Sequence, residues 1–154
     1  MRELTSARRS GLFALAIALA LAYVDVPQSV AQPSAKKSMQ VFVAPSEDRK
    51  ATTIFSSDVP TIYAFWQGGS LADGDKIKAI WIAEDIGSAG PKESKILEAE
   101  AKVHKPDEHG AFSLSRPADK AWPVGKYAVA IYINGSLAQR AKFTITQGVQ
   151  VEVH

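Results

Sequence analysis

The stretch WPVGKYAVAIYING, residues 122–135, contains the pattern that decides the fold. Between Tyr127 and Ile133 every second residue is aromatic or branched apolar, and the run stops at Asn134-Gly135. Alternation with a period of two indicates a strand with one buried face. Asn-Gly tolerates the positive φ angles of a type I′ turn, whose twist suits a tight β-hairpin. The stretch therefore predicts a strand that leads into a hairpin turn.

The next segment, LAQRAKFTITQ at residues 137–147, supplies the returning strand. One side of this predicted strand consists of Leu137, Gln139, Ala141, Phe143 and Ile145. Gly125-x-Tyr127 is typical of a tyrosine corner, in which the phenol hydroxyl binds a nearby backbone group. Trp81, in the middle of an earlier alternating segment, is a candidate for the central core tryptophan of the same fold.

Further alternating segments, separated by turn residues, precede this hairpin. They predict strands at 39–45, 51–58, 61–67, 76–85, 94–105 and 110–117. Segment 94–105 is rich in Leu, Glu, Ala and Lys, so a helix is an alternative there. Its alternation over eight residues favours a strand, with an inward side made of Leu97, Ala99, Ala101 and Val103. Together the segments predict an all-β fold, an immunoglobulin-like antiparallel β-sandwich of about seven to eight strands.

The N-terminal region has the pattern of a secretory signal peptide. Three arginines in the first ten residues precede fourteen uncharged residues, and Ser29 and Ala31 are the small residues before a cut at Gln32. An uncleaved anchor is the alternative, but fourteen apolar residues fall short of the roughly 20 that span a bilayer. We therefore expect a signal peptide at 1–31, a flexible lead-in at 32–38 and the sandwich at 39–154. The processed chain is then periplasmic or secreted, without a membrane contact.

Composition excludes several classes of partner and chemistry. Without residues 1–31 the chain keeps 15 basic and 14 acidic residues, and no Lys/Arg cluster is interleaved with aromatics. Nucleic acid is therefore not an expected partner. The sequence has no cysteine, which excludes disulfides, thiolate metal sites, a cysteine nucleophile and a lipid on a lipobox cysteine.

The order of the alternating segments resembles a broad group of uncharacterised bacterial exported domains with an immunoglobulin-like sandwich. The segments are IFSSDVPTIYAFW, GDKIKAIWIAED, GAFSLSRP and WPVGKYAVAIYINGSLAQRAKFTI. In that group a strand with a tryptophan precedes a terminal hairpin that begins Trp-Pro-x-Gly-x-Tyr. The resemblance covers about residues 51–146 and rests on structural motifs. It implies the fold and an accessory or interaction role, and it implies no catalytic residue and no ligand.

Candidate chemical groups are few. His104 and His109 flank KPDE, and imidazole with carboxylate oxygen suits zinc or copper, but the spacing matches no defined site and a polar turn explains it better. Glu84 and Asp85 are adjacent on a predicted strand, so they point to opposite faces and do not suit acid–base catalysis at one bond. No Gly-x-Ser-x-Gly or phosphate-binding glycine loop occurs. We therefore expect no enzyme, no metal and no cofactor.

Two binding modes stay open. Trp66, Trp122 and Tyr132 are candidates for an exposed aromatic surface that stacks on sugar rings. Alternatively, an edge strand, either 39–45 or the alternating tail 148–154, pairs with a protein partner. The sequence thus predicts a non-catalytic exported binding or structural module of the bacterial cell envelope. The alternatives for its role are a carbohydrate- or envelope-polymer-binding module and an inhibitor or chaperone that acts through an edge strand. Its oligomeric state is left open.

Overall fold

Eight strands and one 3₁₀ turn at Gly87–Ala89 make up the regular structure in the computed structural model, which describes residues 37–48, 50–106 and 108–148. The strands are β1 (Met39–Ala44), β2 (Ile54–Ser56), β3 (Thr61–Gly68), β4 (Lys76–Asp85), β5 (Ser94–Lys102), β6 (His109–Ser115), β7 (Gly125–Ile133) and β8 (Ser136–Thr146). The predicted signal peptide, residues 32–36 of the lead-in and residues 149–154 of the tail lie outside the described residues. Within the described part of the chain, no helix has the length and apolar character needed to cross a bilayer.

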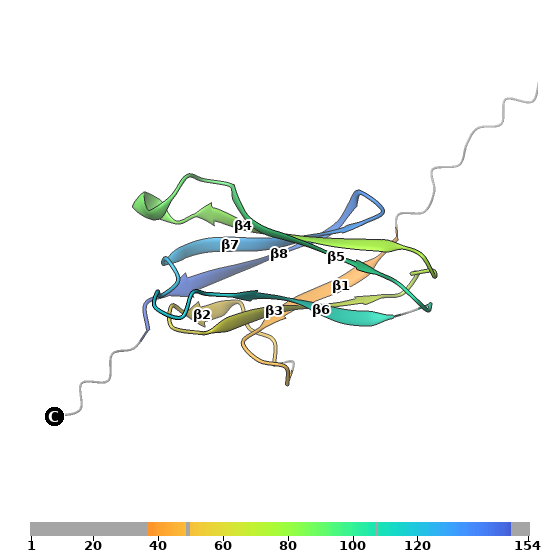
Figure 1. Ribbon diagram of the computed structural model, residues 1–154, viewed down its shortest axis with the longest axis horizontal. Helices are drawn as coiled ribbons and strands as arrows, with labels where there is room; N and C mark the ends of the chain where they lie inside the picture. Colours follow the sequence, from red (N-terminus) through yellow and green to blue (C-terminus); the bar gives the residue numbers. More distant parts are fainter. Residues whose placement is uncertain (1–36, 49, 107, 149–154) are drawn as a thin grey trace, which may run out of the picture. The chain divides into compact units, whose positions relative to one another are not determined.

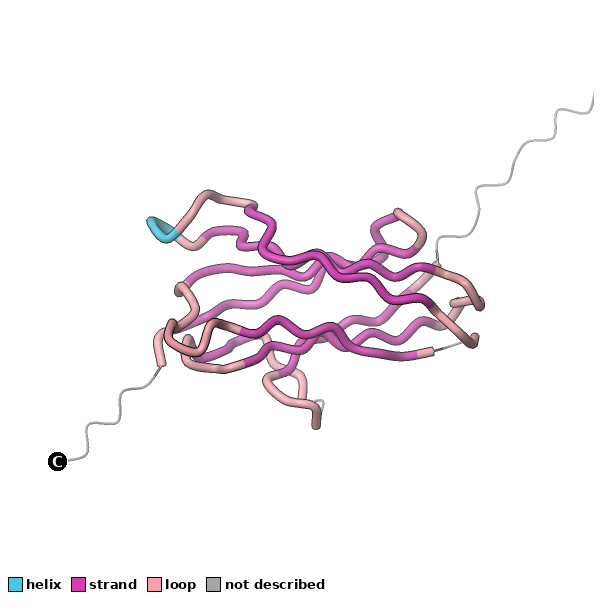
Figure 2. The backbone as a smooth tube through the Cα atoms, in the orientation of Figure 1, coloured by secondary structure: helices cyan, strands magenta, loops and turns pink. Residues whose placement is uncertain are grey.

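The strands form two layers that face each other (Figures 1 and 2). One sheet has the order β1-β3-β6, and the other has the order β2-β8-β7-β4-β5. All neighbours are antiparallel except β2 and β8, which are parallel. The order β1-β3-β6 matches strands A-B-E of the immunoglobulin fold, and the order β8-β7-β4-β5 matches strands G-F-C-C′. The predicted immunoglobulin-like β-sandwich is thereby confirmed.

The terminal hairpin is also confirmed. Asn134 and Gly135 have φ angles of 49° and 85°, and Ile133 lies opposite Ser136. A register shift after Ile131 pairs Ile131 with Gln139 and Tyr132 with Leu137, so that Ala138 forms a bulge. The bulge moves Leu137 to the outer face, where it is 41% exposed. The prediction that Leu137 lies on the same side of the strand as Gln139 and Phe143 is therefore wrong.

The tyrosine corner is present at the start of β7. The Tyr127 hydroxyl donates a hydrogen bond to the Pro123 carbonyl oxygen at 2.6 Å, and burial raises the pKa of Tyr127 to about 12. Phe143 from β8 stacks on Tyr127 and meets Trp81 edge to face. Trp81 is fully buried, as predicted, and lies at the centre of the core.

Two predicted strands differ from their observed extent. The strand predicted at 51–58 is observed only as β2, over Ile54–Ser56. It begins late because the Thr52 N–H still donates to the Val43 carbonyl oxygen of the other sheet. Segment 94–105 is a strand and not a helix, and it ends at Lys102. Its inward side is less covered than predicted, since Leu97 is 42% exposed.

Candidate functional site

The two tryptophans proposed for a sugar-binding surface belong to the core. Trp66 is 5% exposed and packs against Phe112, with ring centroids 6.5 Å apart. Trp122 is 8% exposed, and its indole N–H donates to the Val59 carbonyl oxygen at 2.8 Å. The expectation that these side chains are exposed is therefore wrong.

Tyr132 is the half-buried member of the predicted surface. It lies on the outer face of β7, between Lys78 of β4 and Leu137 of β8. Trp66 belongs to the other sheet, and Trp122 lies in the loop before β7. The fold therefore does not bring the three candidates together.

A different row of aromatic rings crosses the outer face of the three-stranded sheet. Phe42 and Phe65 lie opposite each other in register, with centroids 5.3 Å apart and planes at 24°. Tyr63 and Phe65 are 6.0 Å apart with planes at 20°. At these distances the rings stack on one another, so their faces are largely used within the row. Phe65 is accordingly only 7% exposed, and the row is a poor flat platform for a sugar.

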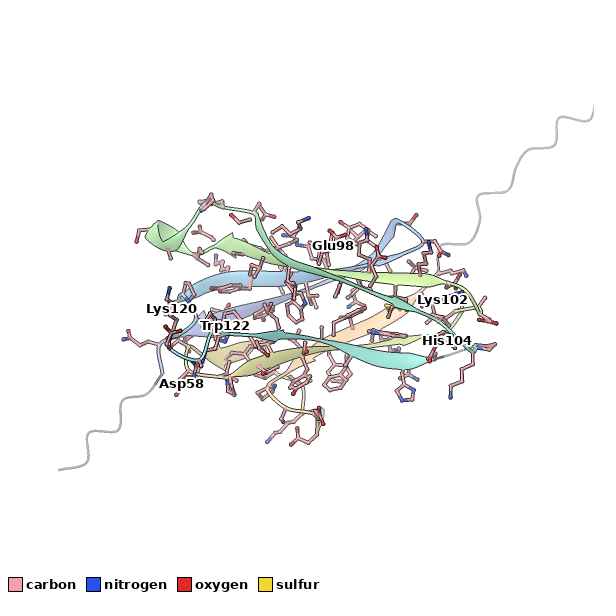
Figure 3. All side chains as sticks on the ribbon, in the orientation of Figure 1. Asp58, Glu98, Lys102, His104, Lys120 and Trp122 are labelled. Carbon is pink, nitrogen blue, oxygen red and sulfur yellow. The ribbon has the colours of Figure 1, made fainter. Side chains whose placement is uncertain are left out.

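Among the residues that the structure places, His104 and His109 do not converge with other potential metal ligands. His104 lies in the β5–β6 connection, at the opposite end of the sandwich from Trp122 (Figure 3). Its backbone N–H donates to Glu108 Oε2 at 2.7 Å, while exposed His109 begins β6. Among the described residues, no group of three or more His, Asp or Glu side chains is placed to hold a metal ion. The local hydrogen bond is that of a polar turn.

The adjacent acids Glu84 and Asp85 are engaged separately. Arg140 binds Glu84 through Nε at 3.1 Å and Nη2 at 2.7 Å, and it also reaches Glu93 at 2.8 Å. Asp85 instead accepts a hydrogen bond from the Gly87 N–H and pairs with Lys92. Each carboxylate thus has cationic partners, which is not the arrangement of a general acid and base that share one substrate.

Asp75 is the only polar residue that is buried in the described chain, and it joins three segments. Lys37 Nζ and the Ala72 N–H bind Oδ2, and Asn134 Nδ2 donates to Oδ1 at 2.9 Å. The hydrogen bond from Lys37, followed by those from Ala72 and Asn134, lowers the pKa of Asp75 from 3.8 to about 2. Asp75 lies between the strands predicted at 61–67 and 76–85, and nothing in the sequence separates it from neighbouring Asp73.

Acid should therefore weaken the fold through Asp75. The folded-state pKa is depressed, so the stabilisation is complete above about pH 4 and is lost as the pH falls toward 2. We expect a loss of about 1–2 kcal/mol in the free energy of unfolding, since Lys37 is a third exposed and partly screened. Urea unfolding at a series of pH values measures it. Asp75→Asn should flatten the profile in this range, and an equally steep profile in that variant would contradict the assignment.

The strand edges differ in how well they are protected against pairing with another chain. The edge strand β5 carries four charged residues and a bulge at Ile96. The open part of β8 carries Arg140, Lys142 and the bulge at Ala138. β2 has only three residues. Charges, bulges and short length all discourage strand addition at these edges.

β1 borders a groove of about 550 Å³ that it shares with β8. Val41, Val43 and Ala141 form part of its lining, and Gln139 Nε2 donates across it to the Val41 carbonyl oxygen at 3.5 Å. The Val43 carbonyl is bound by the Thr52 N–H. Side-chain and loop contacts therefore already engage part of the β1 edge.

The β6 edge has none of these protections. Its sequence, HGAFSLS, contains no lysine, arginine, acid or proline, and it pairs with β3 without a register shift. In the described chain no strand is hydrogen-bonded to its other side. The side chains of Ala111, Ser113 and Ser115 are exposed, while Phe112 and Leu114 face the core. A flat, uncharged seven-residue edge is a template for an added strand.

β5 is an edge strand of the five-stranded sheet, and β6 is an edge strand of the three-stranded sheet. Both lie on the same side of the sandwich, toward the viewer in Figure 1. Leu97 of β5 lies opposite Trp81 in register and so faces the inner side, yet it is 42% exposed. Ala99 and Ala101 on the same side are only partly buried. We name Leu97, Ala99, Ala101 and the edge of β6 the β5–β6 edge site.

Comparisons with known proteins add little to this geometry. No family model and no curated protein matches the sequence. An immunoglobulin-like protein from Pseudomonas aeruginosa has a TM-score of 0.45 and 11% identity, over 71% of this chain and 91% of that chain. The DNA glycosylase AlkC from Pseudomonas fluorescens has a TM-score of 0.45 and 14% identity, over 74% of this chain. A β-glucosidase from Listeria innocua has a TM-score of 0.46 and 7% identity, over 74% of this chain.

This chain spans 31% of the length of the glycosylase and 17% of that of the glucosidase. The abasic-site DNA and the glucose in those two structures are ligands of those proteins. At these identities and scores the likenesses describe strand arrangement alone and carry no argument about activity.

Proposed function

We propose that the chain is a non-catalytic binding module of the bacterial cell envelope, exported by its N-terminal leader, that takes a strand from a protein partner at the β5–β6 edge site. The single observation that carries this proposal is the edge of β6, which has no Lys, Arg, Asp or Glu and pairs with no further strand of the described residues, together with half-exposed Leu97. The immunoglobulin-like sandwich is consistent with such a module. The buried Trp66 and Trp122 give the carbohydrate-binding alternative less support.

Strand addition at this site has a definite chemistry. The backbone of the added strand would bond the free N–H and C=O groups of β6, and this supplies affinity. Side chains at alternate positions would point under β5 and bury Leu97 and Ala99. The partner segment is therefore extended, with apolar residues at every second position. A second copy that paired through its own β6 would bring its β5 against the β5 of the first copy. A single extended segment avoids this contact and therefore fits better.

The test is capture of partners from the native envelope by the processed chain and by two variants. Ser113→Lys places a charge on the β6 edge, and we expect it to weaken capture about tenfold, the effect of roughly 1.4 kcal/mol. Gln40→Lys is the matched control, because Gln40 is exposed on β1, two strands from the β6 edge. It should capture as well as the unsubstituted chain.

Hydrogen exchange of the complex supplies a second readout. Amides of β6 should become protected, while those of β5 on the outer edge should change little. Retention of polysaccharide alone, or equal losses for both lysine variants, would contradict the proposal. Mass spectrometry of the exported chain tests the leader separately, since detection of residue 1 would show that cleavage does not occur.

A further inference from the structure

Asn134 is in a sequence prone to deamidation, and its side chain is held by hydrogen bonds from outside its turn. It is the only asparagine in the sequence, and glycine follows it. Asparagine before glycine is prone to deamidation because the glycine N–H is unshielded and its backbone is mobile. The type I′ turn needs these residues for their positive φ angles, so the fold requires the susceptible pair.

The reaction needs a particular movement of the side chain. The Gly135 backbone nitrogen loses its proton and attacks Asn134 Cγ, the bond from Cγ to Nδ2 breaks, and ammonia leaves. Solvent water then opens the resulting five-membered imide at one of its two carbonyls, which gives aspartate or isoaspartate. Asn134 Cγ must therefore be able to swing over the nitrogen of Gly135.

Contacts outside the turn hold both ends of this amide. Asn134 Nδ2 donates to Asp75 Oδ1 at 2.9 Å, and the Lys76 N–H donates to Asn134 Oδ1 at 2.9 Å. The Asn134 N–H also bonds the Lys76 carbonyl oxygen. Rotation of the side chain toward Gly135 breaks two hydrogen bonds, and the one to the Asp75 carboxylate is charge-assisted.

Asp75 is itself fixed in place. Its other oxygen, Oδ2, receives Lys37 Nζ and the Ala72 N–H, so the carboxylate stays ionised and oriented toward Asn134. Asn134 is exposed to solvent, and water therefore has access once the amide is released. We propose that Asn134 is a deamidation site whose reaction is suppressed in the folded chain, and that Asp75 is the positioning residue that restrains its side chain.

The product would act back on the same contacts. An aspartate at position 134 has no side-chain N–H to donate and sets a second carboxylate at hydrogen-bond distance from Asp75. Isoaspartate adds a backbone methylene and changes the turn. Either product disrupts the hydrogen bonds that join Lys37 and the β7–β8 turn to Asp75. Deamidation therefore destabilises the end of the sandwich where it occurs.

The test measures deamidation of the intact chain at mildly alkaline pH. Trypsin releases residues 127–140, a peptide whose only asparagine is Asn134, and mass spectrometry gives the rate. The native chain should react at least about tenfold more slowly than the same chain in urea. Asp75→Ala should react about tenfold faster than the native chain, and Lys37→Ala should fall between them. Asp73→Ala is the matched control and should match the native rate, since the exposed Asp73 side chain makes no hydrogen bond or ion pair in the described chain.

Hydrogen exchange shows whether Asp75→Ala reacts faster because the Asn134 side chain is released or because the fold is lost. In the first case the backbone amides of β7 and β8 stay protected during the incubation. If Asp75→Ala loses this protection, the comparison is made with Lys37→Ala instead. A native chain that deamidates as fast as in urea would overturn the proposal. A folded Asp75→Ala or Lys37→Ala variant at the native rate would overturn the role of Asp75.

Discussion

Replacing Gly125 with alanine is expected to lower the free energy of unfolding by about 3 kcal/mol or more. A Cβ at this position would lie 2.3 Å from the Asp85 carbonyl oxygen and 2.9 Å from Ile86 Cα. Both are backbone atoms, so the start of β7 must move away from β4. That movement disturbs Tyr127, which follows two residues later and holds the tyrosine corner. Urea unfolding followed by far-UV circular dichroism measures the loss.

Gly135→Ala is the comparison variant, because alanine there has an unfavourable backbone conformation but no steric clash. A Cβ at Gly135 meets no atom within 4 Å, but its φ of 85° is unfavourable for alanine. We therefore expect a smaller loss, about 1–2 kcal/mol. Equal losses in the two variants would mean that the close approach of β7 to Asp85 is not what requires glycine.

Trp81→Ala should lower the free energy of unfolding by about 3–5 kcal/mol, because it leaves a large cavity at the centre of the core. The side chain is fully buried and meets Phe143 edge to face at 6.2 Å. Its indole Nε1 has no hydrogen-bond partner in the described chain. Trp81→Phe should therefore recover more than half of the loss, since it keeps an aromatic ring and removes an unpaired N–H.

Leu97→Ala is the control for this core substitution. Leu97 faces the same side of the sheet but is 42% exposed, so its truncation should cost less than about 1 kcal/mol. Chemical denaturation followed by far-UV circular dichroism serves for all three variants, because it does not depend on tryptophan fluorescence. A large loss for Leu97→Ala would indicate that β5 is covered in solution, and the β5–β6 edge site would then have to be reconsidered.

Alternation of residue type was sufficient to predict the strands that have one covered face. β4 runs over Lys76–Asp85 as predicted, and the turn at Asn134-Gly135 followed from the positive φ angles that it needs. A bulge is not visible in such a pattern, because one extra residue leaves the remaining alternation intact. The prediction that Leu137 and Gln139 share one side of the strand was therefore wrong.

Exposure at strand ends was harder to predict. Trp122 precedes β7 in an irregular segment, and sequence position alone suggested an exposed ring. Its burial depends on the carbonyl oxygen of Val59, which is distant in the sequence. The exposure of Leu97 depends equally on a non-local fact, the absence of an opposing strand beyond β6 in the described chain. Local patterns carry neither kind of information.

The edge site and the Asp75 cluster needed the folded arrangement for the same reason. The pattern of HGAFSLS predicts an ordinary short strand, and only the sheet order shows that no second strand of residues 37–48, 50–106 and 108–148 pairs with it. Asp75 becomes distinct from Asp73 once Lys37 and Asn134 converge on it from remote parts of the chain.

The parallel pairing of β2 with β8 has a mechanical consequence. Ile54 lies opposite Thr144 and Ser56 opposite Thr146, so two strands that are distant in the sequence run in the same direction. Tension applied between the N-terminal side of β2 and the C-terminal side of β8 pulls these strands in opposite directions along their length. Their hydrogen bonds are then loaded in shear and share the force, whereas an antiparallel pair pulled from one end opens one bond at a time. Between these two points of attachment, the β2–β8 pair is therefore a mechanical clamp that resists extension.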